Sequence, residues 1–232
     1  MVQVNNNTPI ILRVKFTKTG NLQYISHLDL VRTMHKTVVR SKLPLAYTEG
    51  FNPKPKMVFA APLSIGTESV CEFLDIKLKE KIAPELAMEL LNRNMTEEMQ
   101  VVEAYYPESR LTELRWLSYD ITLKNCGNMN HIAKLCDQAL SEEKIEILKK
   151  TKSGEAIVDI RGMIKFASCA YDGENIQIKC ILSADPSAFL NPEYIVKYLR
   201  KSCGILSSED LTQEYYSILR CKAYFSDMRE FR

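Results

Sequence analysis

The beginning of the chain alternates between apolar and polar residues. Over residues 10–18 this alternation predicts a half-buried strand, with Leu12, Val14 and Phe16 on its apolar side. The polar side carries Arg13, Lys15 and Thr17. A helix is expected to begin at Ser26, with Asp29 three residues later as an imperfect capping box, and to end before Pro44.

Further elements of the first half follow from similar patterns. Pro84 suits the first turn of a second helix, and the turn at residues 64–69 joins two strands into a hairpin. The expected elements are strands at 57–63, 71–78 and 100–106, and a helix at 84–94. Together with the first strand and helix they give the order β-α-β-β-α-β, which is that of a ferredoxin-like unit.

The second half is less regular but follows a similar order. A hairpin is expected around Asp172-Gly173, where a turn sequence separates two alternating runs. The expected elements are strands at 117–123, 144–149, 156–160, 163–170, 175–182 and 216–224, and helices at 130–140 and 191–202. We therefore predict an α+β fold of two tandem ferredoxin-like (βαββαβ) halves packed together, over residues 9–108 and 115–228.

Composition narrows the class of protein. The chain is 46% hydrophobic and 26% charged, which is ordinary for a globular protein. It contains neither the apolar core of a signal peptide nor a membrane-spanning run of about 18 apolar residues, so we expect a cytoplasmic protein with no membrane partner. Its seven cysteines are odd in number and widely spaced, which favours reduced and mostly buried thiols over a disulfide framework.

Positive charge is concentrated near the beginning of the chain. The net charge of the whole chain is only +2, but residues 13–56 carry nine basic and two acidic side chains, a net charge of +7. The remaining residues then carry a net charge of −5. Such an asymmetry indicates a polyanionic partner better than the total charge does.

The first expected helix separates its apolar and basic residues. At 100° per residue its apolar face collects Leu28, Val31, Met34, His35 and Val38, with His27 among them. Its opposite face carries Arg32, Lys36 and Arg40 at positions i, i+4 and i+8. Most charged stripes of this kind are simply solvated faces. This one has only Asp29 as a counter-charge, which favours a binding surface.

A second basic element follows closely, in the sequence Gly-Phe-Asn-Pro-Lys-Pro-Lys of residues 50–56. Its two prolines stiffen an extended chain and place Lys54 and Lys56 on one side. Phe51, with Tyr47 nearby, offers a ring on which an unpaired base could stack. The alternative is that Phe51 fills the core and the prolines only turn the chain. The predicted nucleic-acid-binding residues are Arg32, Lys36, Arg40, Tyr47, Phe51, Lys54 and Lys56.

Tyr24, Ser26 and His27 suggest a different chemistry. A histidine near a helix N-terminus, beside a hydroxyl and a tyrosine, could carry out general acid–base catalysis in a metal-independent ribonuclease. The structural alternative is that Ser26 caps the helix and His27 packs beneath it. Since no partner carboxylate is evident, the structural interpretation is favoured and no catalytic residue is assigned.

Motifs for metals and cofactors are incomplete. Cys126, His131 and Cys136 match three positions of the zinc-knuckle pattern C-x2-C-x4-H-x4-C, but the fourth position is Leu123. The sequence also has no glycine-rich phosphate loop and no cysteine cluster suited to an iron–sulfur centre. We therefore expect no metal and no cofactor.

Several short motifs between residues 26 and 66 carry a family resemblance. They are Ser-His-Leu-Asp-Leu at 26–30, Leu-Pro-Leu-Ala-Tyr at 43–47, Gly-Phe-Asn-Pro at 50–53 and Pro-Leu-x-x-Gly at 62–66. A weaker match lies around 159–161. With these motifs the chain closely resembles the radical-SAM-linked proteins, a bacterial family of unknown function (domain-of-unknown-function family 2344). It differs from fused members in lacking a radical-SAM domain of its own.

The resemblance implies an accessory role beside a separately encoded radical-SAM protein that acts on RNA or on a ribosomal component. Together with the basic residues, it predicts an accessory RNA- or ribonucleoprotein-binding protein. Two alternatives remain open: a metal-independent ribonuclease that uses His27, and a scaffold that binds only proteins. The family lends no accepted catalytic residues.

Overall fold

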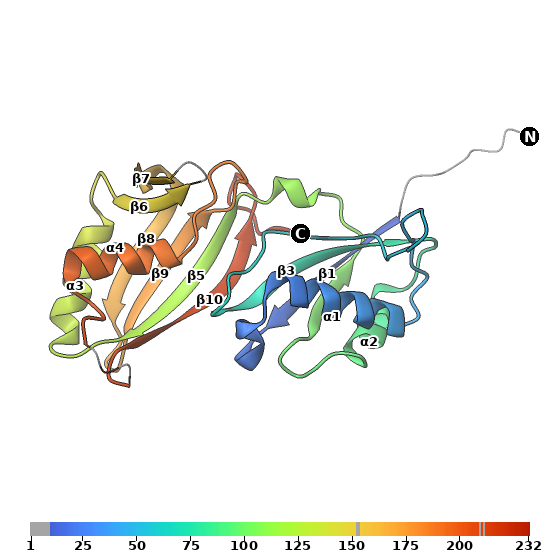
Figure 1. Ribbon diagram of the computed structural model, residues 1–232, viewed down its shortest axis with the longest axis horizontal. Coiled ribbons are helices and arrows are strands. Elements are labelled where there is room, and N and C mark those ends of the chain that lie inside the picture. Colours follow the sequence, from blue (N-terminus) through green and yellow to red (C-terminus); the bar gives the residue numbers. More distant parts are fainter. Residues whose placement is uncertain (1–9, 152–153, 209, 211) are drawn as a thin grey trace, which may run out of the picture. The chain divides into compact units, whose positions relative to one another are not determined.

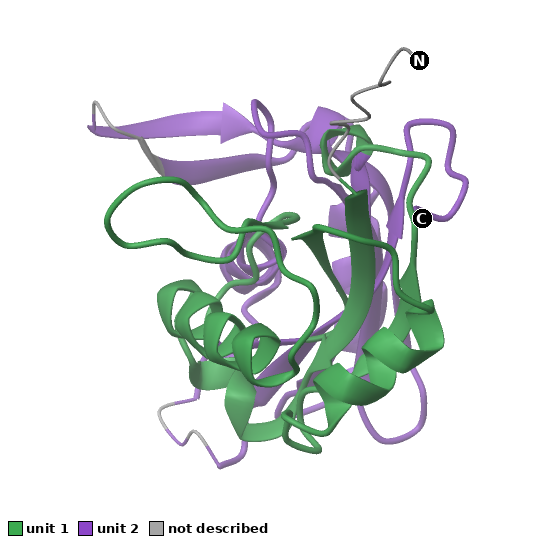
Figure 2. Cartoon of the chain, turned by 90° about the vertical axis from the view of Figure 1, so that its right-hand side faces the viewer, with its two compact units in different colours: residues 1–65, 69–113, 232 green, residues 66–68, 114–231 purple. Residues whose placement is uncertain are grey.

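The computed structural model describes residues 10–151, 154–208, 210 and 212–232. The chain forms two compact units, shown in different colours in Figure 2. Unit 1 consists of the described residues as far as Ile65, together with Ser69–Glu113 and Arg232. Unit 2 consists of Gly66–Glu68 and Leu114–Phe231. The predicted domain limits, 9–108 and 115–228, stay a prediction.

Unit 1 has the predicted βαββαβ order (Figure 1). Its elements are β1 (Ile10–Lys18), α1 (His27–Arg40), β2 (Met57–Phe59), β3 (Thr67–Leu78), α2 (Pro84–Asn92) and β4 (Val101–Tyr105), with short 3-10 turns at Gly20–Tyr24 and Leu111–Glu113. The strands lie in the order β4-β1-β3-β2, and all neighbours are antiparallel. This is the strand order of a ferredoxin-like sheet. Strand β2 is shorter than expected, because only three residues pair with β3.

The core of unit 1 lies between the sheet and both helices. The alternating residues of β1 and β3 supply its sheet side: Leu12, Val14, Phe16, Leu74, Ile76 and Leu78. The helices supply Leu30, Met34, Val38, Ala87 and Leu91. The helical wheel was wrong at Leu28, which is 56% exposed, and it omitted Leu30, which is buried. Val31 and His35 of the expected apolar face are only half-buried. The buried residues of α1 are Leu30, Met34, Thr37 and Val38, at regular helical spacing, so the buried face of the whole helix lies to one side of the expected face.

Arg13 corrects the predicted polar side of β1. Its side chain is 0% exposed rather than solvated. The guanidinium donates to both carboxylate oxygens of Asp75 on β3, from Nε at 2.7 Å and from Nη2 at 2.9 Å. It also donates to the hydroxyl and the carbonyl oxygen of Ser109, each at 3.0 Å. A bidentate pair with further hydrogen bonds offsets the desolvation of the two charges, so the arginine can be buried.

Unit 2 repeats the same topology (Figure 1). Its sheet and helices are β5 (Trp116–Lys124), α3 (Met129–Leu140), β8 (Ile164–Tyr171), β9 (Ile176–Ser183), α4 (Glu193–Cys203) and β10 (Tyr215–Tyr224). The strand order is β10-β5-β9-β8, with all neighbours antiparallel. Two βαββαβ units in tandem confirm the predicted α+β fold class.

One additional hairpin interrupts the βαββαβ order of unit 2. Strands β6 (Glu146–Thr151) and β7 (Gly154–Asp159) form their own two-stranded antiparallel sheet between α3 and β8. Hydrogen bonds close its base: the Ile160 N–H donates to the Ile145 carbonyl at 2.8 Å, and the Ile145 N–H donates to the Asp159 carboxylate at 3.1 Å. Both isoleucines are fully buried, so the hairpin is anchored at its base.

The seven cysteines are free thiols, and four of them are buried: Cys71, Cys136, Cys169 and Cys180. Burial raises the pKa of the Cys180 thiol, which keeps it protonated. Within the described ranges, no helix is long and apolar enough to cross a membrane.

Candidate nucleic-acid interface

Helix α1 begins with a polar network at its N-terminus. The Ser26 hydroxyl oxygen accepts the backbone N–H of Asp29 at 3.1 Å, and the hydroxyl donates to the Asp29 carboxylate at 2.6 Å. Arg32 donates to the other oxygen of the same carboxylate at 3.1 Å. The hydrogen bonds from Ser26 and then Arg32 lower the pKa of Asp29. Ser26 is therefore the N-cap, and Asp29 is the local counter-charge of Arg32.

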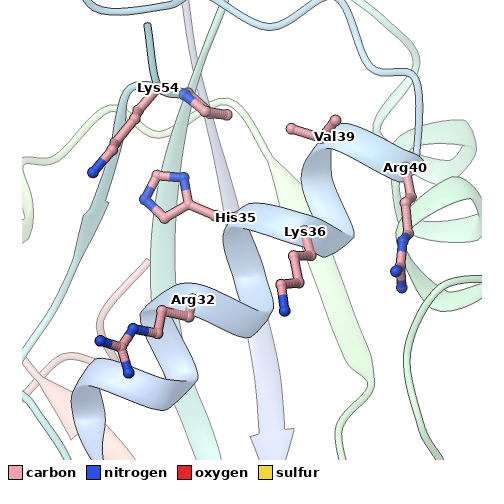
Figure 3. A pocket seen from close by; sticks show the side chains of 7 residues that line it. Arg32, His35, Lys36, Val39, Arg40 and Lys54 are labelled. Atoms are coloured by element: carbon pink, nitrogen blue, oxygen red, sulfur yellow. The ribbon is translucent and has the colours of Figure 1, made fainter. Parts of the chain in front are cut away.

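The basic residues of α1 line a hollow of about 450 Å³ together with the segment that follows (Figure 3). We call it the basic hollow. Its lining residues are Arg32, His35, Lys36, Val39, Arg40, Lys54 and Pro55. Four of the seven predicted binding residues, all of them basic, thus surround one concavity. No acid is among the lining residues.

A short antiparallel pairing holds Lys54 at the basic hollow. Residues Tyr47 and Pro55 form an isolated bridge. Around it, the Thr48 N–H donates to the Lys54 carbonyl at 2.8 Å, and the Lys54 N–H donates to the Thr48 hydroxyl at 3.0 Å. The Lys56 N–H donates to the Ala46 carbonyl at 2.9 Å. The prolines occupy positions where no N–H is used, which explains how a proline-rich segment pairs here.

The tip of this loop presents an aromatic ring to solvent. Gly50 has a φ of +114°, a conformation that other residues rarely adopt. The next residue, Phe51, is fully exposed, so the alternative that Phe51 fills the core was wrong. Tyr47 is also exposed, whereas Lys56 is half-buried and does not line the basic hollow. The three remaining predicted residues thus lie on the loop that leads to and from Lys54.

His35 is a residue of the hollow that the sequence pattern assigned to the apolar face. Its ring lies between the basic residues of α1 and Lys54, as Figure 3 shows. Burial, followed by the positive charge of Lys54, lowers the pKa of His35 from its ordinary value of 6.5. His35 is therefore neutral at pH 7 and can donate or accept a hydrogen bond there. On the helical wheel His35 lies at the border between the apolar and basic faces, next to Arg32 and Lys36. This position could have assigned it to the hollow from the sequence.

The alternative catalytic residues have structural contacts of their own. Ser26 is occupied by the helix cap, and Tyr24 is exposed at the end of the preceding 3-10 turn. The His27 ring packs edge-on against Phe59 of β2, with the ring centroids 5.5 Å apart. Ser26 thus caps the helix and His27 packs against a neighbouring ring, as the structural alternative expected. A catalytic role for these residues stays a prediction.

The incomplete zinc motif is not assembled into a site. Cys126 and His131 are exposed, whereas Cys136 is buried in α3, where its thiol meets those of Cys169 and Cys203. Throughout the part of the chain that the structure describes, no group of three or more metal-ligating side chains could hold a metal ion.

Comparison with known families identifies the chain. Residues 12–192 match the model of a family described as "Uncharacterized protein conserved in bacteria (DUF2344)". The chain belongs to this family. Every motif between residues 26 and 66 lies within the matched range, and so does the whole basic hollow. Among the curated proteins, none matches the chain.

A solved structure supports the fold. The chain resembles one in the "Crystal Structure of a Cbf5-Nop10-Gar1 Complex", with a TM-score of 0.51 and 10% sequence identity. The similarity covers 91% of this chain and 48% of the other, so the chain spans about half the length of that relative. At this identity the likeness shows a related fold alone.

Proposed function

We propose that this member of the DUF2344 family is an accessory RNA- or ribonucleoprotein-binding protein that works with a separately encoded radical-SAM enzyme. The observation that carries the RNA-binding part is the basic hollow, where Arg32, Lys36, Arg40 and Lys54 surround one concavity. The partnership with a radical-SAM enzyme is supported by the resemblance in the motifs between residues 26 and 66.

The chemistry of the hollow suits a nucleic-acid strand. Its four positive side chains attract phosphates, and their binding releases the counterions that surround the strand. Val39 and Pro55 give the same concavity apolar contact area for a ribose or base. Phe51, fully exposed on the adjoining loop, can stack on an unpaired base, which favours a single strand over a duplex.

The test is RNA binding by a variant with Arg32→Ala, Lys36→Ala and Arg40→Ala. Binding of a fluorescent oligouridylate, about 12 nucleotides long, is measured by anisotropy at several salt concentrations. Each phosphate contact on a single strand contributes about −0.7 to the log–log salt slope, so the loss of three contacts should flatten the slope by about 2. Affinity at low salt should fall at the same time.

The matched control replaces Lys79, Lys81 and Arg93 by Ala. These residues are also exposed in unit 1 but do not line the basic hollow, so both variants lose the same charge. The proposal predicts a large effect for the α1 variant and a small one for the control. Equal affinities and slopes for the two variants would show that the hollow is not the site.

The partner is tested separately. The tagged protein is purified from native lysate with and without nuclease, and the eluates are analysed by mass spectrometry and RNA sequencing. Recovery of both RNA and a radical-SAM protein is expected. A protein partner that remains after nuclease treatment, with no RNA in either eluate, would favour the protein-binding scaffold instead.

A further inference from the structure

The sheet of unit 2 has one face that its helices do not cover. Helices α3 and α4 pack on the other face, where Tyr216 of β10 donates to Glu193 of α4 and Cys169 of β8 lies against Cys136 of α3. Along β5 the residues alternate strictly: Leu117, Tyr119, Ile121 and Leu123 are buried on the helix side. The intervening residues are half-buried or exposed: Trp116, Ser118, Asp120, Thr122 and Lys124. We call their side of the sheet the open face.

Strand register places the other members of the open face. On β9, Ile181 lies opposite Ser118 and Lys179 opposite Asp120. On β8, Phe166 lies opposite Ile181. On β10, the partners of Lys124 and Trp116 are Tyr215 and Tyr224. The open face therefore carries aromatic rings on three of its four strands: Trp116, Phe166, Tyr215 and Tyr224.

Two rings of the open face, on β8 and β10, are strongly exposed. Phe166 on the edge strand β8 is 48% exposed, and Tyr215 on β10 is 49% exposed. Because β10 and β8 are the first and fourth strands, three spacings of about 4.8 Å separate them across the sheet. The two rings also lie at opposite ends of β5, near Lys124 and Ser118. They can therefore contact different nucleotides of one strand, but not the same base.

Lysines are interleaved with these rings. The Lys165 ammonium lies 5.8 Å from the centre of the Trp116 ring, and the Lys124 ammonium lies 5.9 Å from that of Tyr215. Lys179 is exposed in the middle of the face, where Asp120 is its cross-strand neighbour. Basic side chains next to exposed rings form the combination that holds unpaired bases by stacking and the backbone by charge.

We propose that the open face of unit 2 is a second binding surface for single-stranded RNA. Phe166 and Tyr215 stack on bases, and Lys124, Lys165 and Lys179 contact phosphates. The open face would bind the same class of ligand as the basic hollow but shares no residue with it. Variants of the two surfaces can therefore give different results. A protein partner fits less well, because lysine is depleted at protein–protein interfaces. A duplex fits less well because its bases are already stacked.

The chain provides a built-in probe of this surface. Its single tryptophan is Trp116, which lies on the open face. Titration with unlabelled oligouridylate should change the fluorescence of Trp116 if RNA binds there. The change should persist in the variant with Arg32→Ala, Lys36→Ala and Arg40→Ala, at the weaker affinity of that variant.

Two pairs of variants test the open face directly. Phe166→Ala with Tyr215→Ala should weaken RNA binding roughly tenfold or more, since each stacked base contributes measurably to affinity. Lys124→Ala with Lys179→Ala should flatten the salt slope by about 1.4. Their control is Lys134→Ala with Lys201→Ala, two exposed lysines of α3 and α4, and it should leave affinity and slope nearly unchanged. If the variant without Phe166 and Tyr215 folds poorly, the variant without Lys124 and Lys179 still tests the open face.

The outcomes separate the two surfaces. The open-face proposal fails, and the proposed function stands, if three results coincide. RNA leaves the Trp116 fluorescence unchanged, the open-face variants bind RNA as tightly as the wild-type protein, and the α1 variant binds it weakly. If the open-face variants weaken binding and the α1 variant does not, the open-face proposal stands and the basic hollow is not the RNA-binding site. If the wild-type protein binds no RNA, both proposals fail.

Discussion

Each unit has a pair of oppositely charged residues at a matching place in its sheet, but the two pairs differ in burial. In each unit the first and third strands of the βαββαβ order pair in register, and the pairs are Arg13 with Asp75 and Asp120 with Lys179. In unit 1 the arginine is fully buried and its carboxylate partner is held by two short hydrogen bonds. In unit 2 Lys179 is exposed and Asp120 is half-buried.

The cause of the difference lies in the segments that cover the sheet of unit 1. Ser109 accepts two hydrogen bonds from Arg13, and its hydroxyl also donates to the carbonyl of Arg232. The guanidinium of Arg232 lies 5.4 Å from the centre of the Tyr105 ring. These contacts cover the Arg13–Asp75 pair on the helix-free side of the sheet of unit 1. Unit 2 instead keeps Lys179 exposed on the sheet itself.

The helices show the same division. Helix α1 presents Arg32, Lys36 and Arg40 to solvent, whereas its counterpart α3 has Lys134 as its one basic residue besides His131. One topology thus carries two different surfaces. The comparison teaches that the surface of each unit depends on what covers it and on a few side chains, rather than on the fold.

The largest expected effect concerns the two charge pairs. Asp75→Ala leaves Arg13 buried without its partner, which should lower the free energy of unfolding by about 3–5 kcal/mol. Asp120→Ala, at the matching place in unit 2, should cost about 1 kcal/mol or less because its neighbour is exposed. Urea unfolding followed by circular dichroism measures both. Similar losses for the two variants would remove the distinction between a covered and an exposed charge pair.

A smaller effect is expected at the helix N-termini. Ser26 caps α1 and Asn128 caps α3, each accepting the backbone N–H three residues later at 3.1 Å. Ser26→Ala and Asn128→Ala should each destabilise the protein by about 1 kcal/mol, measured by thermal or urea unfolding. Only Ser26→Ala should also weaken RNA binding, since α1 carries the basic hollow. Equal RNA affinities for both variants would argue against this assignment.

The smallest effect is a dependence of stability on pH. The folded state lowers the pKa of His35, so on acidification the unfolded state takes up its proton first, near pH 6.5. The free energy of unfolding should therefore decrease as the pH falls through 6.5 and below, and His35→Gln should remove this part of the decrease. Urea unfolding at a series of pH values measures it. Parallel curves for wild type and variant would show that His35 is not desolvated.

Much of the fold could be predicted from periodicity. The alternation around β1 and β5 placed both strands within about two residues of their observed ends, because one buried face imposes a strict period of two. The basic stripe of α1 was also readable, since three charges at helical spacing must share one side. Both signals are local, and local signals survive without knowledge of the rest of the molecule.

Features that depend on distant segments were not readable. The alternation of β1 separates Arg13 from the core, but it does not reveal that Ser109 covers it from another part of the chain. The rings of the open face come from Trp116, Phe166, Tyr215 and Tyr224, which only strand register brings to one side. The assignment of His35 to the apolar face had a local cause, because His35 lies at the boundary between two helix faces.

The inserted β6–β7 hairpin has a consequence for how the molecule tolerates change. Since Ile145 and Ile160 are joined by a hydrogen bond, the two ends of the insertion already lie close together. The entropy of closing a loop grows only slowly with its length, so a longer, shorter or foreign segment between these ends costs little extra. This neck is therefore a natural place to graft a reporter domain, with the four-stranded sheet of unit 2 left unbroken.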